Sequence, residues 1–211
     1  MRDVKEFIRG LPCWKGSVEI ATHPGGITNQ NFLVQDQNEK FFARVGEDIP
    51  VHGVMRCNEL AASRAACAVG LAPEVVCSAP GVLVMKFIRG RTLASKDVQR
   101  EETLRKILSL IGRCHRYMRA YIRGSANLFW VFQVLRNYAA TLRDENNRLA
   151  AQLPRLMEIA DRLEEIVGTM QLVFGHNDLL AANFIDDGDR LWLIDWDYAG
   201  FNSPLFDLAN L

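Results

Sequence analysis

The sequence predicts an α+β chain in two parts, an antiparallel sheet with one helix followed by a mainly helical lobe. Short stretches rich in strand-forming residues, separated by turn residues, fill most of the chain up to residue 88. An alanine-rich stretch with helical spacing interrupts them, and residues 95–168 carry helix-length periodicity with few strand formers. The change of character at residues 89–93 predicts a boundary between an N-terminal lobe, 1–88, and a C-terminal lobe, 89–211.

The N-terminal lobe begins with a predicted short helix at residues 4–11, because Pro12 discourages its continuation. Strands, punctuated by Pro24-Gly25-Gly26, by a polar turn at 36–38 and by Ala79-Pro80-Gly81, are predicted at 17–22, 31–35, 40–45, 74–78 and 82–88. The alanine-rich stretch predicts a helix over 52–69, and Gly70 suits the left-handed residue that ends many helices. The order of strands indicates an antiparallel meander.

The C-terminal lobe is predicted to hold three long helices and then three short strands. A break is expected at Gly124 and an interruption at Pro154. The helices span 96–121, 129–145 and 148–167, and the strands span 171–174, 183–186 and 190–194.

Composition and charge exclude several classes of protein. Hydrophobic residues make up 49% of the chain and charged residues 24%, which is ordinary for a globular protein and argues against disorder and disulfide scaffolds. Twenty-five basic and twenty-five acidic side chains cancel, so the broad positive field of a nucleic-acid binder is missing. We therefore expect no nucleic-acid partner.

The cysteines and the N-terminal sequence predict a cytoplasmic location. The cysteines are five, an odd number, and lie scattered among apolar neighbours, which is typical of reduced thiols rather than of a zinc site. The first eleven residues mix charged and apolar side chains and lack the core of a secretory signal. No run approaches membrane-spanning length, so we expect no stable membrane insertion.

Three oxygen-bearing side chains near the C-terminus carry the strongest chemical signal. A predicted strand leads into a loop with Asp178, Asn183 opens the next strand, and Asp195 ends a third strand. Phosphoryl transfer needs magnesium on the nucleotide phosphates and a carboxylate beside the attacking hydroxyl. Asn183 and Asp195 offer the hard oxygen atoms that magnesium accepts, and Asp178 would orient the hydroxyl and receive its proton. A solvated turn is the alternative for any one of these residues, and their fixed order favours catalysis.

These segments resemble the choline/ethanolamine kinase family, within the wider aminoglycoside phosphotransferase and protein-kinase-like group. The similar segments are His176-Asn177-Asp178 with Asn183, Ile194 to Ala199, and Phe206 to Ala209. The resemblance implies a bilobal protein-kinase-like fold, ATP and Mg²⁺ as cofactors, and nucleotide binding by the N-terminal lobe. It also implies a supporting metal role for Asp197, where the family usually carries glutamate.

The resemblance extends to the N-terminal lobe at residues 25–32. Gly25 and Gly26 permit close approach of the backbone to phosphate, and Thr28 and Asn29 add hydrogen-bonding groups. This segment is similar to the family's nucleotide loop, and a plain glycine hairpin turn is the alternative interpretation.

Other nucleotide contacts are implied for the strand ending at Arg44 and for the link between the lobes. Arg44 stands where related kinases place a basic residue against the nucleotide phosphates, and its expected partner is Glu59 on the alanine-rich helix. A surface ion pair of little energetic value is the alternative. Met85 and Phe87 lie in the segment that resembles the hinge contacting the adenine edge.

The resemblance also assigns supporting roles near the catalytic loop. His176 is expected to brace this loop by hydrogen bonding rather than to transfer a proton, and Asp207 is expected to anchor it from beneath. His115 lies within a predicted helix, where packing or capping is expected of it rather than catalysis. Trp196 and Tyr198 offer aromatic faces that attract a quaternary ammonium, although aromatic side chains commonly fill cores instead.

The expected substrate is a small amino alcohol, choline or ethanolamine. Thiamine and aminoglycosides stay open as alternatives, because the shared motifs report the reaction and hardly constrain the acceptor. The arginines of the helical lobe disfavour a polycationic drug. The chain stops where the family's polypeptide continues, so weak or absent turnover by these residues alone is expected, and a nucleotide-binding module without turnover is a further alternative. The sequence gives no indication of the oligomeric state.

Overall fold

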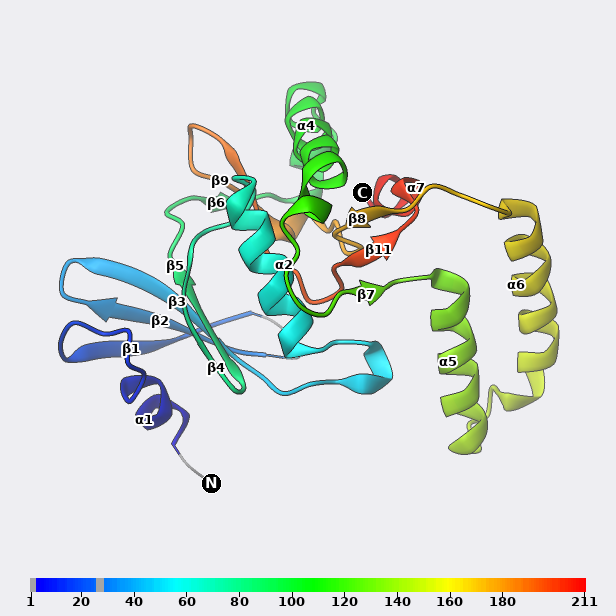
Figure 1. The fold of residues 1–211 in the computed structure, drawn as a ribbon, viewed down its shortest axis with the longest axis horizontal. Coiled ribbons are helices and arrows are strands. Elements are labelled where there is room, and N and C mark those ends of the chain that lie inside the picture. The colour runs from blue at the N-terminus through cyan, green and yellow to red at the C-terminus, as the bar shows by residue number, and fades with distance from the viewer. Residues whose placement is uncertain (1–2, 26–28) are drawn as a thin grey trace.

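The N-terminal part of the chain forms a five-stranded sheet with one short helix on it. The computed structural model describes residues 3–25 and 29–211. Helix α1 (Val4–Arg9) precedes an antiparallel sheet in the order β1-β2-β3-β5-β4 (Figure 1). Its strands are β1 (Val18–His23), β2 (Gln30–Asp36), β3 (Glu39–Val45), β5 (Val82–Lys86) and β4 (Val75–Ala79).

The side chains of β3 alternate between the two faces of the sheet, which places Arg44 on the face opposite the buried core. Phe41 and Ala43 are buried in a cluster with Val84 of β5 and Ile8 of α1. Because successive side chains of a strand point to opposite faces, Arg44 projects from the other face. That face meets helix α2 (Arg56–Ala68), which lies between the sheet and the rest of the molecule (Figure 1).

The C-terminal part is built from helices and two small sheets. One sheet has the order β10-β9-β6 and the other β7-β11-β8. The α-helices are α3 (Ser95–Val98), α4 (Glu101–Tyr117), α5 (Val131–Asp144), α6 (Leu153–Val167) and α7 (Pro204–Asn210). The strands are β6 (Arg91–Thr92), β7 (Asn127–Leu128), β8 (Val173–Gly175), β9 (Phe184–Asp186), β10 (Leu191–Leu193) and β11 (Gly200–Asn202). Short 3-10 turns are η1 (Pro50–His52), η2 (Met118–Ala120), η3 (Ala150–Gln152) and η4 (Ala181–Asn183).

Helix α2 packs with the helical lobe although it follows the sheet in sequence. Ala62, Ala65 and Ala66 lie in the same buried cluster as Ile107 of α4 and Phe174 of β8. Small alanine side chains let this helix approach its neighbours closely. The division into 1–88 and 89–211 stays a prediction, and the core of the helical lobe includes one helix from before residue 88.

Several predicted boundaries were wrong for local reasons. The helix predicted over 96–121 is divided into α3 and α4, and the carboxylate of buried Asp97 accepts a bond from Ala94 N–H at the start of α3. The helix predicted from residue 52 begins at Arg56, after a 3-10 turn that contains Pro50. Pro154 does not interrupt a helix, because it occupies the first turn of α6, where a missing N–H is harmless.

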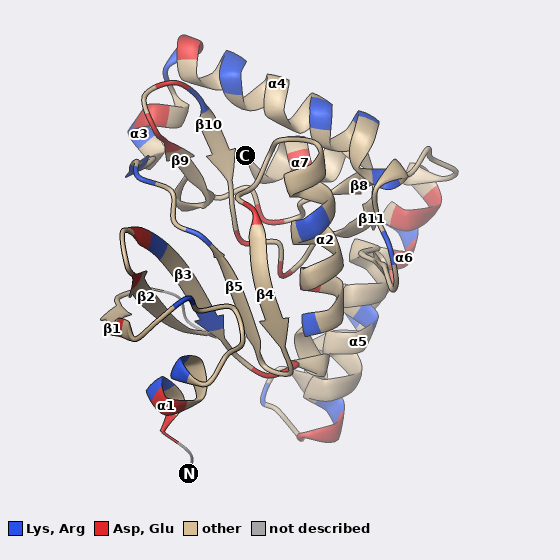
Figure 2. Ribbon diagram, turned by 60° about the vertical axis from the view of Figure 1, so that its left-hand side comes forward, with Lys and Arg blue, Asp and Glu red and all other residues tan. Residues whose placement is uncertain are grey.

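Charges of both signs are interspersed over the helices rather than gathered on one face. Figure 2 shows red and blue segments together on α1 and on α4. This distribution agrees with a formal net charge of zero. Within residues 3–25 and 29–211, no helix combines the length and the apolar character needed to cross a lipid bilayer.

Candidate active site

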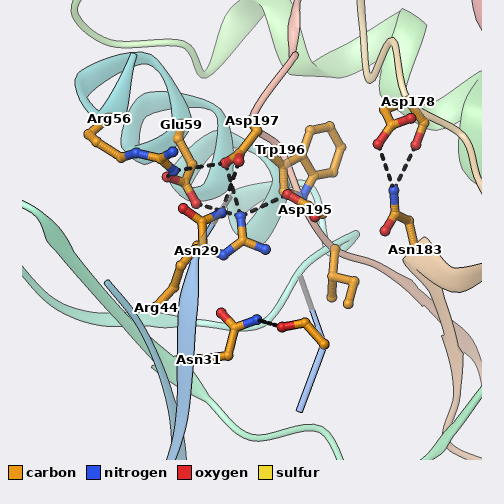
Figure 3. A network of polar contacts seen from close by, with 12 residues as sticks. Asn29, Asn31, Arg44, Arg56, Glu59, Asp178, Asn183, Asp195, Trp196 and Asp197 are labelled. Atoms are coloured by element: carbon orange, nitrogen blue, oxygen red, sulfur yellow. Dashed lines mark hydrogen bonds and ion pairs between the residues drawn. The ribbon is translucent and has the colours of Figure 1, made fainter. Parts of the chain in front are cut away.

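The loop after β8 presents Asp178 at the junction of the two parts of the molecule. Asp178 is half-buried, and the Asn183 side-chain amide holds it from the following turn. Asn183 Nδ2 donates to the Asp178 backbone carbonyl at 2.8 Å and to Oδ2 of its carboxylate at 3.2 Å (Figure 3). Since the amide nitrogen is used on Asp178, Asn183 Oδ1 is the atom left for another ligand.

Strand pairing brings Asp195 next to Asn183. In the β9–β10 hairpin Leu193 lies opposite Phe184, and Ile194 N donates to the Asn183 carbonyl at 2.9 Å. Asp195 is the next residue and leaves the strand with φ of 67°, a left-handed conformation that is uncommon for aspartate. Such backbone strain concentrates at functional sites. The Asp195 side chain is 33% exposed, so part of it is buried and part is open to solvent.

The loop that carries Asp178 is braced from beneath by buried groups. His176 Nε2 lies 2.9 Å from the Ile194 carbonyl, which can only accept, so Nε2 donates and Nδ1 is free to accept the Asp178 N–H at 3.3 Å. Asp207 accepts the His176 and Asn177 backbone N–H groups at 3.1 and 2.7 Å. The ring of His115 adds a contact of 2.7 Å between Nε2 and Asp207 Oδ2. The expected bracing contacts of His176 and Asp207 are therefore present.

The carboxylate of Asp207 is kept ionised by these donors. Burial alone would raise its pKa, but the hydrogen bonds from His115 and from Asn177 N–H outweigh burial and lower the pKa below its ordinary value. Gly175 is required beside it, because a Cβ there would lie 2.8 Å from Asp207 Oδ2.

Arg44 is the centre of a buried charge cluster on the other side of Asp195. Its Nη1 lies 2.8 Å from Glu59 Oε1, 2.8 Å from Asp195 Oδ1 and 3.0 Å from Asp197 Oδ1 (Figure 3). The side chain of Arg44 is only 8% exposed. The expected partner Glu59 is thus in contact with Arg44, and the alternative of a surface ion pair is wrong.

Arg56 is a member of this cluster that the sequence analysis did not identify. It is the first residue of α2, and its Nη1 lies 2.6 Å from Glu59 Oε2 and 3.1 Å from Asp197 Oδ1. The only sequence signal was its position three residues before Glu59, which places both side chains on one face of a helix. Nothing local indicated the contact with Asp197, which lies 141 residues away.

The cluster carries more negative than positive charge. Two arginines, Arg44 and Arg56, face the three carboxylates of Glu59, Asp195 and Asp197. Burial raises the pKa of Glu59 even though both arginines oppose the shift, and the charge of Asp197 adds to the rise. For Arg44, burial alone would lower the pKa, but the surrounding carboxylates outweigh it and raise the pKa above its ordinary value. An added cation would relieve this excess of negative charge.

Burial also shifts the pKa of Asp178, the candidate base. The pKa of Asp178 is raised chiefly by desolvation and further by the charge of Asp195, while His176 and the hydrogen bond from Asn183 oppose the rise. A higher pKa makes this carboxylate a better proton acceptor than an ordinary surface aspartate.

The donor set suits magnesium that is held jointly with a nucleotide. Among the residues that the structure describes, no group of three or more His, Cys, Asp or Glu side chains could hold a metal ion alone. Magnesium in such sites commonly uses one or two protein ligands, and phosphate oxygens and waters complete its shell. Asp195 and Asn183 Oδ1 meet that requirement as hard oxygen donors, one just after β10 and the other just before β9.

The predicted nucleotide loop is described only at its two ends. Gly25 has φ of 114°, which suits glycine, and its carbonyl accepts a bond of 2.8 Å from Asn31 Nδ2. Asn29 Nδ2 donates to Asp197 Oδ2 at 3.1 Å. Gly26 and Thr28 lie outside the described residues. Met85 lies in β5 opposite Phe42, and Phe87 follows that strand with its N–H bonded to the Lys40 carbonyl at 3.1 Å, at the connection to the helical lobe.

The two aromatic candidates for substrate binding occupy different environments. Trp196 is 2% exposed, packs edge-on against His176 and belongs to the core of the helical lobe. A side chain so completely enclosed by its own chain presents no face to an acceptor, so the predicted substrate contact of Trp196 is wrong. Tyr198 is half-buried and its ring meets Phe129 edge-on at 6.2 Å. Burial raises the pKa of its hydroxyl, and Tyr138 and Asp178 add to the rise.

A small antiparallel sheet packed against a mainly helical lobe, with a loop aspartate, an asparagine and a strand-end aspartate at their junction, defines the protein-kinase-like fold class. The solved structure of choline kinase LicA from Streptococcus pneumoniae has this fold, with a TM-score of 0.76 and 24% identity, over 99% of this chain and 72% of that chain. The predicted fold class is confirmed.

Comparison by sequence narrows the class to one family. The choline/ethanolamine kinase family model matches residues 20–211, and the chain therefore belongs to that family. Protein LicA of Haemophilus influenzae is 29% identical over 192 residues, which cover 89% of this chain and 56% of that protein. Ethanolamine kinase 2 of Mus musculus is 28% identical over 217 residues, covering 97% of this chain and 56% of that protein. The chain thus spans about half the length of these two curated relatives.

Proposed function

We propose that this protein transfers the γ-phosphoryl group of ATP to the hydroxyl of a small amino alcohol, choline or ethanolamine. The observation that carries the proposal is the bond between Asn183 and Asp178 one strand away from Asp195, within a chain of the choline/ethanolamine kinase family. This arrangement joins a candidate base to two candidate metal ligands, which are the protein groups that phosphoryl transfer requires.

In the proposed reaction the oxygen of the acceptor hydroxyl attacks the γ-phosphorus and gives its proton to Asp178. The bond between the γ-phosphorus and the bridging oxygen breaks, and ADP leaves with that oxygen. Asn183 fixes the carboxylate through its amide nitrogen, and His176 fixes the loop through the Asp178 N–H. Because the pKa of Asp178 is only raised from an ordinary aspartate value, orientation contributes more than basicity. Arg44, released from Asp195 when the nucleotide enters, contacts the phosphates with its permanent positive charge.

Asn183 Oδ1 and Asp195 would hold the magnesium ion. When bound, the ion neutralises the developing charge on the phosphate oxygens. This assignment is supported by the one-third exposure of the Asp195 side chain and by the excess of one carboxylate over the arginines in the adjoining cluster.

In this proposal the acceptor binds beside Tyr198 and Phe129. Their rings meet edge-on, and Phe129 also packs against Phe206 of α7 at 5.2 Å. Aromatic faces beside the carboxylate of Asp178 suit a positively charged amino alcohol. The charge of Arg136 on α5 does not by itself disfavour an aminoglycoside, because Asp161 and Glu164 pair with it.

The proposal is tested by supplying ATP labelled at its γ-phosphate with choline, ethanolamine, thiamine and an aminoglycoside in separate reactions. We expect labelled phosphocholine or phosphoethanolamine, its loss in Asp178→Ala, and its retention in Asp189→Ala, which removes an exposed carboxylate from the nearby β9–β10 turn. ATP binding without transfer to any acceptor would favour the alternative of a nucleotide-binding module. Transfer only to thiamine or to the aminoglycoside would assign the acceptor differently.

We propose a cytoplasmic location, which is where the substrates and reduced cysteines are expected.

A further inference from the structure

We propose that Asp197 is a positioning residue that joins Asn29 of the predicted nucleotide loop to the arginine cluster, and that it does not ligate the metal. This inference rests on the proposed function and concerns the same site. It departs from the supporting metal role implied for residue 197, where this chain carries aspartate and the family usually carries glutamate.

Both carboxylate oxygens of Asp197 are already engaged. Oδ1 lies 3.0 Å from Arg44 Nη1 and 3.1 Å from Arg56 Nη1, and Oδ2 accepts from Asn29 Nδ2 at 3.1 Å (Figure 3). The side chain of Asp197 is 7% exposed, whereas that of Asp195 is 33% exposed. Asp195 has a single arginine contact, through Oδ1, among the described residues. Asp195 is therefore open to a cation, and Asp197 would have to give up two arginines and an asparagine first.

The bond to Asn29 spans 168 residues and connects two functional segments directly. Asn29 lies within the predicted nucleotide loop, immediately before β2, and Asp197 comes two residues after the strand-end Asp195. Gly46 lies beside Asn29 and makes the contact between Asn29 and Asp197 possible, because a Cβ at residue 46 would overlap Asn29 Oδ1. A glycine at this place is thus a steric requirement of the contact rather than of its own backbone.

Arg56 secures the other side of Asp197. Its backbone N–H donates to Asp48 Oδ1 at 2.6 Å, its Nε donates to the Glu47 carbonyl at 2.9 Å, and its Nη1 reaches Glu59 and Asp197. The position of Asn29 relative to Asp195 is consequently set through Asp197 by a rigid helix terminus. Prior ordering of a binding segment reduces the entropy lost when the ligand binds.

Binding measurements separate the two roles of Asp197. We would titrate a fluorescent ATP analogue into the protein with EDTA present and then with increasing Mg²⁺, comparing wild type, Asp197→Asn and Asp195→Asn. For Asp197→Asn we expect about tenfold weaker binding with and without Mg²⁺, as for loss of a hydrogen bond to a charged group, and an unchanged Mg²⁺ midpoint. Asp195→Asn, as the matched variant, should raise the Mg²⁺ midpoint instead. A raised midpoint in Asp197→Asn with unaltered metal-free binding assigns the metal role to Asp197 and overturns the proposal.

Hydrogen exchange tests the same contact in the nucleotide-free protein. Peptides containing Asn29 and Asn31 should exchange several-fold faster in Asp197→Asn and in Gly46→Ala than in wild type or Asp195→Asn, because both first variants remove the support of Asn29. Asp197→Asn is expected to fold, since two arginines then face two carboxylates. Unchanged exchange in both variants overturns the proposal. Faster exchange in a protein that binds no ATP would leave the positioning contact in place and reject the proposed function alone.

Discussion

Replacing Arg44 by leucine should destabilise the protein strongly, in a way that depends on pH. The side chain is 8% exposed and, among the residues that the structure describes, is the one group that contacts Glu59, Asp195 and Asp197 together. Without it, Asp195 loses its one arginine contact among the described residues, and the buried carboxylates of Glu59 and Asp197 keep only the arginine contact from Arg56. Removing one partner of a buried ion pair typically costs about 3–5 kcal/mol, because the remaining charge keeps its desolvation penalty.

The pH dependence follows from Glu59. Its pKa is already raised in the folded protein by burial, and losing Arg44 removes the largest opposing charge and raises it further. A carboxyl whose pKa is higher in the folded than in the unfolded chain binds more protons when folded, so stability falls as the pH rises through that range. The deficit of Arg44→Leu should therefore be largest above neutrality and should shrink as the pH is lowered towards the ordinary glutamate pKa of 4.5.

The assay is urea unfolding at several values between pH 5 and pH 8, with the double variant Arg44→Leu/Glu59→Leu beside the single one. The double variant should recover most of the lost free energy, because apolar residues of similar volume often replace a buried ion pair without cost. A loss below about 1 kcal/mol for the single variant, as measured for exposed pairs, would refute the reasoning. A deficit that does not change with pH would refute the assignment to Glu59.

Two further perturbations address the catalytic loop. Asp178→Asn should abolish phosphoryl transfer and raise the midpoint of thermal unfolding at pH 7.5, because a carboxyl with a raised pKa destabilises the fold when ionised; a lower midpoint would contradict this. His115→Ala should cost about 1–3 kcal/mol in urea unfolding at pH 7, since Asp207 loses a buried partner. The lowered pKa of Asp207 contributes stability above its ordinary value of 3.8 that disappears as the pH falls further, so the difference between wild type and His115→Ala should diminish below about pH 4.

The positions of the strands along the chain and the spacing of the polar residues could be predicted because they follow local rules. Turn residues and short β-rich runs located the five strands of the first sheet, and the helical spacing of alanines located α2. The order of Asp178, Asn183 and Asp195 could be interpreted because each role that phosphoryl transfer requires of them needs an oxygen-bearing side chain. The pairing of Arg44 with Glu59 was expected from the resemblance to related kinases, together with the opposite charges of the two side chains.

Other features were beyond local patterns. Strands β6 and β7 are two residues long and β11 is three, which is too short for any alternation to appear. Trp196 stands between two acids in the sequence, which left both a substrate contact and a place in the core open. Only its packing against His176 and the core of the helical lobe decides for the core.

The sequence by itself determined the family and fold, and the order of the polar residues in the catalytic segments. Tertiary structure alone decided that Arg56 joins the cluster and that Asp197 meets Asn29, contacts that span 141 and 168 residues. The physical reason is that side-chain type and spacing specify strands, helices and chemistry within a short window. Which distant carboxylate an arginine reaches depends on how α2, β3 and the β9–β10 hairpin pack around one point.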